Sequence, residues 1–162
     1  MNQSTDLDLR ILKIKSCSSR TGQSTLNYHV GCDEEGELYF RIYGNSGHGF
    51  FNNNWVSLNA IEDALSQVGP DFTSYALKIL YDHRSSNSPA FLLAALMEER
   101  LVVISTVQKR GYQKTDFGPF KERMKSLIDS STNLDPNSKP PKITKRKQAL
   151  NDDAVIETLV HS

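Results

Sequence analysis

Two short segments of strictly alternating apolar and polar residues constrain the fold of this chain most. They are "TLNYHVG" (25–31) and "ELYFRIY" (37–43), separated by "CDEEGE", which places Gly36 in a turn. Successive side chains of a strand point to opposite faces, so each segment predicts a strand with one apolar face. The apolar positions are Leu26, Tyr28 and Val30 in the first segment and Leu38, Phe40 and Ile42 in the second. Together the segments predict an antiparallel hairpin.

The preceding segment "LDLRILKIK" (7–15) predicts one more strand. Its alternation slips between Ile11 and Leu12, which indicates either a β-bulge or a strand covered on both faces. We therefore expect an antiparallel meander over 7–43, within a β-rich part that extends to 57.

Residues 58–130 show helical spacing interrupted by one β-branched segment. Asn59, followed three residues later by Glu62, fits a capping box for a first helix, which "GP" (69–70) ends. A second helix is predicted from Thr73 and a third from Ser88, with Pro89 at its first position. "LVVISTV" (101–107) predicts a strand, and the turn-forming segment 108–114 is compatible with a return strand.

The segment 117–130 predicts a last amphipathic helix, with an apolar stripe of Phe120, Met124, Leu127 and Ile128. The fold class is therefore α+β, with an N-terminal antiparallel β-meander, a three-helix segment and a C-terminal helix. We expect a single globular domain over 1–130, comprising the meander (7–57) and the helical part (58–130). Residues 131–162 form a basic, Pro-containing tail, poor in large apolar side chains.

Charge and cysteine usage exclude several classes of protein. Lys plus Arg and Asp plus Glu both number 19, whereas a non-specific DNA coat protein is basic. Cys17 and Cys32 are too few for a metal or disulfide framework; we expect two reduced thiols, or one bridge if strands place them side by side. The sequence contains neither a membrane-length apolar run nor a secretory signal, which favours a cytoplasmic protein without a membrane partner.

The stretch "GNSGHGFFNNNW" (44–55) resembles a functional loop but fails the simple catalytic templates. A nucleophile elbow has the pattern G-x-S-x-G, and around Ser46 its fifth position is His48 instead of glycine. A dinucleotide fingerprint has the pattern G-x-G-x-x-G, and its sixth position here is Asn52 instead of glycine. Three interpretations remain: a strand-to-helix connection pinned by Phe50, Phe51 and Trp55; an interaction loop; or a ligand cradle.

The polar face of the predicted hairpin carries Tyr39, Arg41 and Tyr43, with His29 and Asn27 on the neighbouring strand. Exposed Tyr and Arg side chains are enriched at protein interfaces, and they also stack on bases of single-stranded nucleic acid. The alternative is that helices cover this face.

Catalytic, metal and cofactor sites are not indicated. None of the four histidines stands in an HExxH pattern or beside a carboxylate at metal-ligand spacing. We expect no catalytic residues, no metal and no cofactor.

Basic side chains gather at two places that could contact phosphate or an acidic surface. One is the predicted turn, with Lys109, Arg110, Tyr112 and Lys114; the other is "KPPKITKRK" (139–147), with Lys145, Arg146 and Lys147. The alternatives are a solvated hairpin tip and a solvated tail.

The segment "LLAALMEERLVVISTVQKRGYQK" resembles the end of a winged helix domain, whose third helix reads DNA and whose wing tip is basic. Here 91–97 is apolar, so this resemblance leaves only the tip for nucleic acid. "GQSTLNYHVGCDEEGELYFRI", "NSGHGFFNNNWVSLNAIEDAL" and "NSPAFLLAALMEERLV" together resemble uncharacterised accessory proteins of proteobacterial plasmids and integrative elements. That resemblance implies a cytoplasmic bacterial protein concerned with element maintenance, transfer or evasion of host defence.

We therefore expect a non-catalytic accessory protein that binds a protein partner, such as a host defence or element-maintenance complex. The expected contact residues are Tyr39, Arg41, Tyr43, His48, Phe50 and Phe51. The alternative is a nucleic-acid-binding regulator that uses Lys109, Arg110, Lys114, Lys145, Arg146 and Lys147. A small hydrolase-type enzyme with a His48 or His29 site is the third hypothesis. The pattern gives no indication of oligomeric state.

Overall fold

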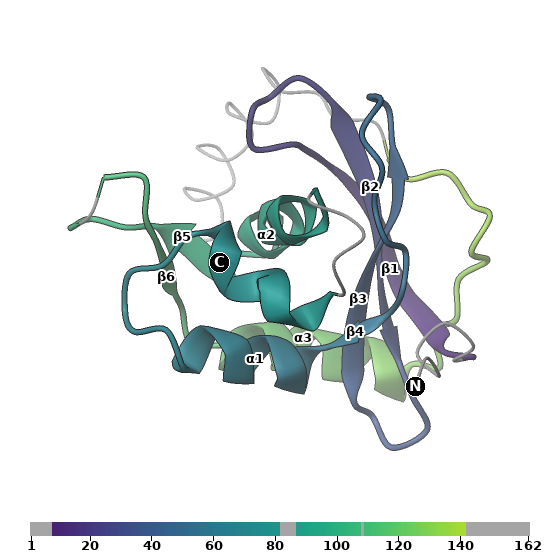
Figure 1. Cartoon of the computed structure of the whole chain (residues 1–162). Helices are drawn as coiled ribbons and strands as arrows, with labels where there is room; N and C mark the ends of the chain where they lie inside the picture. The colour runs from purple at the N-terminus through teal and green to yellow at the C-terminus, as the bar shows by residue number, and fades with distance from the viewer. Residues whose placement is uncertain (1–7, 82–86, 108, 142–162) are drawn as a thin grey trace, which may run out of the picture.

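The N-terminal half forms one antiparallel sheet of four strands in the order β1-β2-β3-β4 (Figure 1). The computed structural model describes residues 8–81, 87–107 and 109–141. The strands are β1 (Arg10–Ser18), β2 (Thr25–Cys32), β3 (Leu38–Asn45) and the short β4 (Val56–Ser57). Each strand pairs with the next along the chain, so the predicted meander is confirmed.

The alternating pattern assigns the two faces of the sheet as predicted. All six apolar positions of the β2–β3 hairpin are buried in the main core. The register of β1 shifts between Ile11 and Lys13, which places an irregularity where the alternation slips. Leu12 packs into the main core, whereas Ile11 joins a small second cluster with Ile14 and Trp55. Both interpretations of this segment are therefore correct, since β1 has a bulge and is covered on two sides.

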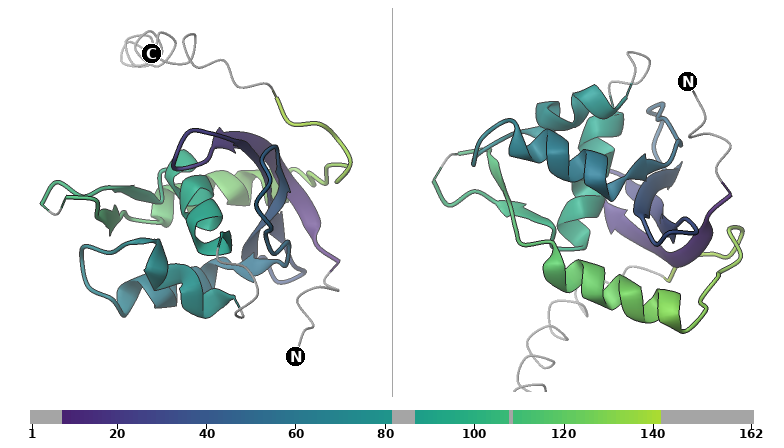
Figure 2. Two further views of the ribbon diagram at one scale, coloured as in Figure 1. Left: turned by 45° about the horizontal axis from the view of Figure 1, so that its top comes forward. Right: turned by 90° about the horizontal axis from the view of Figure 1, so that it is seen from below.

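The helices and a small hairpin lie on one side of the sheet (Figures 1 and 2). They are α1 (Leu58–Ser66), the 3₁₀-helix η2 (Ser74–Leu80), α2 (Ser88–Glu98), β5 (Val102–Ile104), β6 (Tyr112–Lys114) and α3 (Gly118–Asp129). Helix α2 is the central one, and its segment 92–96 is buried throughout. The chain is thus an α+β protein with an N-terminal antiparallel sheet, followed by helices and a second, two-stranded sheet.

The first helix begins differently from the prediction. Ser57 caps α1, because its hydroxyl accepts a hydrogen bond from the backbone N–H of Ala60 at 3.0 Å. Asn59 lies inside the helix, and its side-chain amide donates to Glu37 in the β2–β3 turn at 2.5 Å. The capping box at Asn59 was therefore wrong by two residues, because a tertiary contact engages the asparagine.

A buried acidic side chain joins the end of α2 to the sheet. Glu99 is 3% exposed, and it forms an ion pair with Lys13 at 2.7 Å and accepts a hydrogen bond from the Tyr28 hydroxyl. A second pair links Lys15 to Glu98 at 3.1 Å. The two lysines of β1 that face the helices are therefore neutralised by the last turn of α2 and the residue after it.

The segment after α3 crosses to the other side of the sheet and lies beside the start of β1 (Figure 1). We call residues 131–135 the strap. The N–H of Leu134 donates to the carbonyl of Ile11 at 2.8 Å, and the N–H of Ile11 donates to Asn133 Oδ1 at 3.2 Å. The Arg10 guanidinium donates to the carbonyl of Thr132 at 3.0 Å. The first residues of the segment predicted as a tail are thus attached to the sheet.

The two cysteines are free, buried thiols at opposite ends of the β1–β2 ladder. Cys17 lies opposite Leu26, whereas Cys32 lies opposite Arg10, so the strands do not place the two sulfur atoms side by side. Of the two alternatives, the structure has the unpaired thiols.

Candidate functional site on the outer face of the sheet

The face of the sheet turned away from the helices carries a cluster of aromatic and basic side chains. We call it the outer-face cluster and define it as His29, Tyr39, Arg41, Tyr43 and Trp55. Tyr43 is 40% exposed, Tyr39 and Arg41 are half-buried, and His29 and Trp55 are buried. The predicted trio of Tyr39, Arg41 and Tyr43 therefore lies on one face, and α1, η2, α2 and α3 all lie on the other side of the sheet (Figure 1).

Arg41 is the centre of this cluster. Its guanidinium carbon lies 4.4 Å from the ring centroid of Trp55 and 5.6 Å from that of Tyr43. His29 stands directly opposite Arg41 in the β2–β3 ladder, and its Nδ1 accepts a hydrogen bond from Arg41 Nε at 3.2 Å. The imidazole also stacks on Tyr43, with ring centroids 4.4 Å apart. The guanidinium is thus held by two aromatic rings and one hydrogen bond.

Trp55 reaches this position because residue 31 has no side chain. A Cβ on Gly31 would lie 2.9 Å from Trp55 Cη2 and 2.9 Å from the carbonyl oxygen of Arg10. Both distances are shorter than van der Waals contact, so only glycine lets the indole lie against β2 here. The indole then fills the second cluster together with Ile11 and Ile14.

The contacts of His29 fix the tautomer of its neutral imidazole. Because Nδ1 accepts from the arginine, Nε2 carries the proton. This Nε2–H is buried and has no hydrogen-bond partner in the described part of the chain. Burial, with a smaller effect from Arg41, lowers the pKa of His29 to about 4. The site therefore contains a neutral histidine at pH 7, with one donor left over.

Arg41 also lines a cavity of about 440 Å³ between the outer face and the segment that follows α3. Burial lowers the pKa of its guanidinium, and no carboxylate within 8–81, 87–107 and 109–141 forms an ion pair with it. The other residues of the cavity wall are Asp8, Leu9, Ile11, Trp55, Asn133, Leu134, Asp135 and Pro136. The sequence predicted the arginine but not this wall, since composition assigned 133–136 to a tail.

The glycine- and asparagine-rich loop is anchored to the start of α2. The N–H of Asn52 donates to Ser88 Oγ at 2.8 Å, and Asn87 Nδ2 donates to the carbonyl of Phe50 at 2.9 Å. Phe51 faces inward and packs against Phe91, with ring centroids 6.4 Å apart. Phe50, by contrast, is 86% exposed.

The remaining residues proposed for partner and nucleic-acid contacts do not form one surface. His48 is exposed in the loop, and Lys109 and Arg110 are exposed in the turn between β5 and β6. Lys114 is engaged elsewhere, 3.5 Å from Glu62 and 4.5 Å from the ring centroid of Phe117. Lys145, Arg146 and Lys147 lie outside the described residues.

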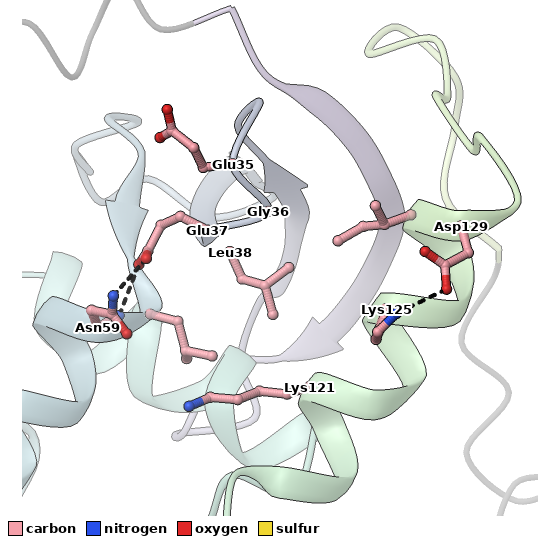
Figure 3. A pocket seen from close by; sticks show the side chains of 10 residues that line it. Glu35, Gly36, Glu37, Leu38, Asn59, Lys121, Lys125 and Asp129 are labelled. Carbon is pink, nitrogen blue, oxygen red and sulfur yellow. Dashed lines mark hydrogen bonds and ion pairs between the residues drawn. The ribbon is translucent and has the colours of Figure 1, made fainter.

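Figure 3 shows a cavity of about 470 Å³ between the β2–β3 turn, the start of α1 and α3. Its charges are largely paired within the chain. Lys125 pairs with Asp129 at 3.1 Å, Lys121 pairs with Glu62 at 3.4 Å, and Glu37 accepts from Asn59. Little charge remains there for a ligand.

A third groove, of about 710 Å³, lies between α1 and η2. Its exposed apolar side chains are Val68, Tyr75 and Ile79.

The described residues offer no arrangement of the common catalytic or metal-binding types. No group of three or more His, Cys, Asp or Glu side chains there could hold a metal ion. Neither His29 nor His48 forms a hydrogen bond to a cysteine or a carboxylate within that part of the chain. Nor does it contain a helix with the length and apolar character to cross a bilayer. Comparison of the chain with protein-family models, with curated proteins and with solved structures gave no match.

Proposed function

We propose that this chain is a non-catalytic binding protein that recognises a protein partner through the outer face of its sheet. One observation carries the proposal: an aromatic and arginine cluster stands on the sheet face opposite to the helices that the structure describes. Tyr, Trp and Arg are the side chains that most often dominate binding energy at protein interfaces. Tyr43 and Arg41 are partly exposed on strand β3, so a partner can reach both.

The rigidity of the cluster supports this function. Tyr43 is stacked on His29, and the guanidinium of Arg41 lies over the indole of Trp55. Side chains already fixed before binding lose little conformational entropy on association, and each immobilised flexible side chain otherwise costs about 0.5–1.5 kcal/mol. The resemblance to accessory proteins of plasmids and integrative elements sets this proposal in the bacterial cytoplasm, with a host defence or element-maintenance complex as the partner.

A pair of matched tyrosine variants tests the proposal. Tagged wild-type protein, Tyr43→Ala and Tyr75→Ala are used to capture partners from a bacterial lysate, before and after nuclease treatment. Tyr75 is 73% exposed on η2, which packs against α1 and α2 on the helix side of the sheet, so it controls for the loss of an exposed tyrosine. We expect the wild-type protein to capture a protein partner both before and after nuclease treatment. This partner should be lost with Tyr43→Ala and retained with Tyr75→Ala. The proposal is contradicted if Tyr43→Ala leaves capture unchanged or if nuclease treatment abolishes capture.

The second candidate function is nucleic-acid binding by the β5–β6 hairpin, as the winged-helix resemblance suggests. The observation that favours it is the exposure of Lys109 and Arg110 at the turn of a hairpin that follows α2. Because α2 is buried, it cannot act as a recognition helix in a major groove, so this candidate relies on phosphate contacts by the turn. A salt titration distinguishes the two candidates, since each phosphate contact on B-DNA contributes a log–log slope of about −0.9.

A further inference from the structure

We infer that the partner presents a carboxylate side chain with a basic side chain beside it, and that Arg41 is the residue that binds the carboxylate. This inference rests on the proposed function, since it concerns the same outer face. It specifies the chemistry of the partner, which the exposure of tyrosines alone does not.

The polar groups at the centre of the outer-face cluster that form no hydrogen bond within the described residues are hydrogen-bond donors. Arg41 uses only its Nε within the described chain, on His29, so its two terminal NH₂ groups remain available. The Nε2–H of His29 is also a donor, but it is buried, so Arg41 supplies the donors that a partner can reach. A guanidinium has a planar fork of donors that matches the two oxygens of a carboxylate. The complement of such a site is an anionic acceptor.

The surroundings of Arg41 make it costly that none of the described residues provides a counter-ion. The side chain is half-buried beside the rings of Trp55 and Tyr43 and lines the 440 Å³ cavity. A partly desolvated charge without a partner loses hydration and gains nothing in return. A carboxylate that enters the cavity offsets this loss, and the aromatic rings hold the guanidinium plane in advance of binding.

The charges around the cavity favour a protein carboxylate over a polyanion. Asp8 and Asp135 both line the same cavity, so a nucleic-acid backbone would meet two negative charges beside the single arginine. The neighbouring cations of β1 are occupied, because Lys13 and Lys15 pair with the end of α2 on the helix side. Binding of nucleic acid needs several phosphate contacts, whereas one acidic residue followed by a basic one complements this pattern of charges.

The only tryptophan of the chain provides a local reporter, since Trp55 lies 4.4 Å from the Arg41 guanidinium carbon. Three probes are titrated into the full-length protein while its fluorescence is recorded. They are a capped hexapeptide with Glu-Lys at its centre, the same peptide with Gln-Lys, and a single-stranded oligothymidylate. We expect saturable binding of the Glu-Lys peptide, at least about tenfold weaker binding of the Gln-Lys peptide, and no competition by the oligonucleotide.

Two arginine variants locate the effect. Arg41→Gln is expected to bind both peptides equally, whereas Arg123→Gln is expected to keep the preference for Glu. Arg123 is a matched control, because it is an exposed arginine of α3 that also lies over an aromatic ring, 5.9 Å from the centroid of Phe120. Should Arg41→Gln fail to fold, as judged by circular dichroism, the NMR signal of Arg41 Nε–H in the wild-type protein takes its place. That signal should shift with the Glu peptide and not with the Gln peptide.

Three outcomes overturn the inference: equal affinity for the two peptides, no saturable change at about 10 mM Glu-Lys peptide, or tighter binding of the oligonucleotide at Trp55. Failure of the proposed function is seen separately in the capture experiment. If capture depends on Tyr43 but is unchanged by Arg41→Gln, the proposed interface is supported and the binding of a carboxylate by Arg41 is contradicted. If neither substitution matters, both proposals fail.

Discussion

The buried histidine of the outer face predicts a specific loss of stability in acid. Burial and Arg41 lower the pKa of His29 from its ordinary value of 6.5 to about 4 in the folded protein. The unfolded chain therefore binds a proton near pH 6.5, whereas the native state does not bind it until about pH 4. The contribution of His29 to the free energy of unfolding is therefore fully present above pH 6.5. It decreases as the pH falls below this value and is lost at about pH 4.

The magnitude follows from proton linkage. A difference of one unit in pKa corresponds to about 1.4 kcal/mol. The difference between the pKa of His29 in the unfolded and in the folded protein therefore lowers the free energy of unfolding by about 3 kcal/mol in total. Between pH 7 and pH 5 the same relation gives about 2 kcal/mol. Carboxylates also titrate in acid, so the prediction concerns the difference between the wild-type protein and a variant without the imidazole.

His29→Gln is that variant, because a glutamine oxygen can still accept from Arg41 Nε but cannot gain a proton. Urea unfolding is followed by the fluorescence of Trp55 at a series of pH values from 7.5 to 4.5, and the free energy of unfolding is extrapolated to water. We expect the wild-type protein to lose about 2 kcal/mol more than the variant between pH 7 and pH 5. Parallel pH profiles refute the reasoning, as does a native-state NMR titration in which His29 protonates near pH 6.5.

Three further predictions concern the packing of the sheet. Gly31→Ala should displace Trp55, shift its emission to longer wavelength and lower the free energy of unfolding by about 1–3 kcal/mol, since the new methyl group would lie 2.9 Å from the indole. Glu99→Ala should lower it by about 3 kcal/mol or more in urea unfolding, because Tyr28 and a lysine then lose their buried acceptor. Burial raises the pKa of the Cys17 thiol to about 12, so this thiol should resist a disulfide reagent at pH 8 in the native protein and react in urea.

Matched substitutions control these experiments. Gly44→Ala places its methyl group 3.1 Å from the side-chain amide of Asn27, which can move, so a loss equal to that of Gly31→Ala contradicts the role given to the indole. Asp129→Asn removes an exposed ion pair and should cost less than about 0.5 kcal/mol. If it costs as much as Glu99→Ala, burial is not the cause. Reaction of Cys17 in native protein at the rate of a free thiol contradicts its burial.

The sheet and its two faces were predictable because the alternation of β2 and β3 is a local signal. The pattern assigned Tyr28 and Phe40 to the core and Arg41 and Tyr43 to the other face, as observed. The position of Trp55 could not be obtained in this way, because β4 has only two residues and its pairing with β3 is a tertiary contact. The central contact of the site, Arg41 against Trp55, therefore needed coordinates.

The wall of the cavity was missed for a different reason. The strap binds β1 through the backbone N–H of Leu134, the backbone carbonyl of Thr132 and the side chain of Asn133, and these contacts leave no apolar periodicity in the sequence. Composition assigns this polar segment to a tail, although its Leu134 and Asp135 line the cavity. The helix cap was missed similarly, since Ser57 and Asn59 both suit the first turn and only the contact with Glu37 separates them.

The attachment of the strap to β1 affects the order in which the molecule can be completed. Arg10 and Thr132 are 122 positions apart, so a ribosome synthesises β1 long before the residues that pair with Ile11 at its outer edge. During that interval the backbone N–H and carbonyl of Ile11 lack these partners, and unpaired groups of this kind can recruit a strand from another chain. The nascent polypeptide, more than the finished protein, is therefore the form at risk of self-association.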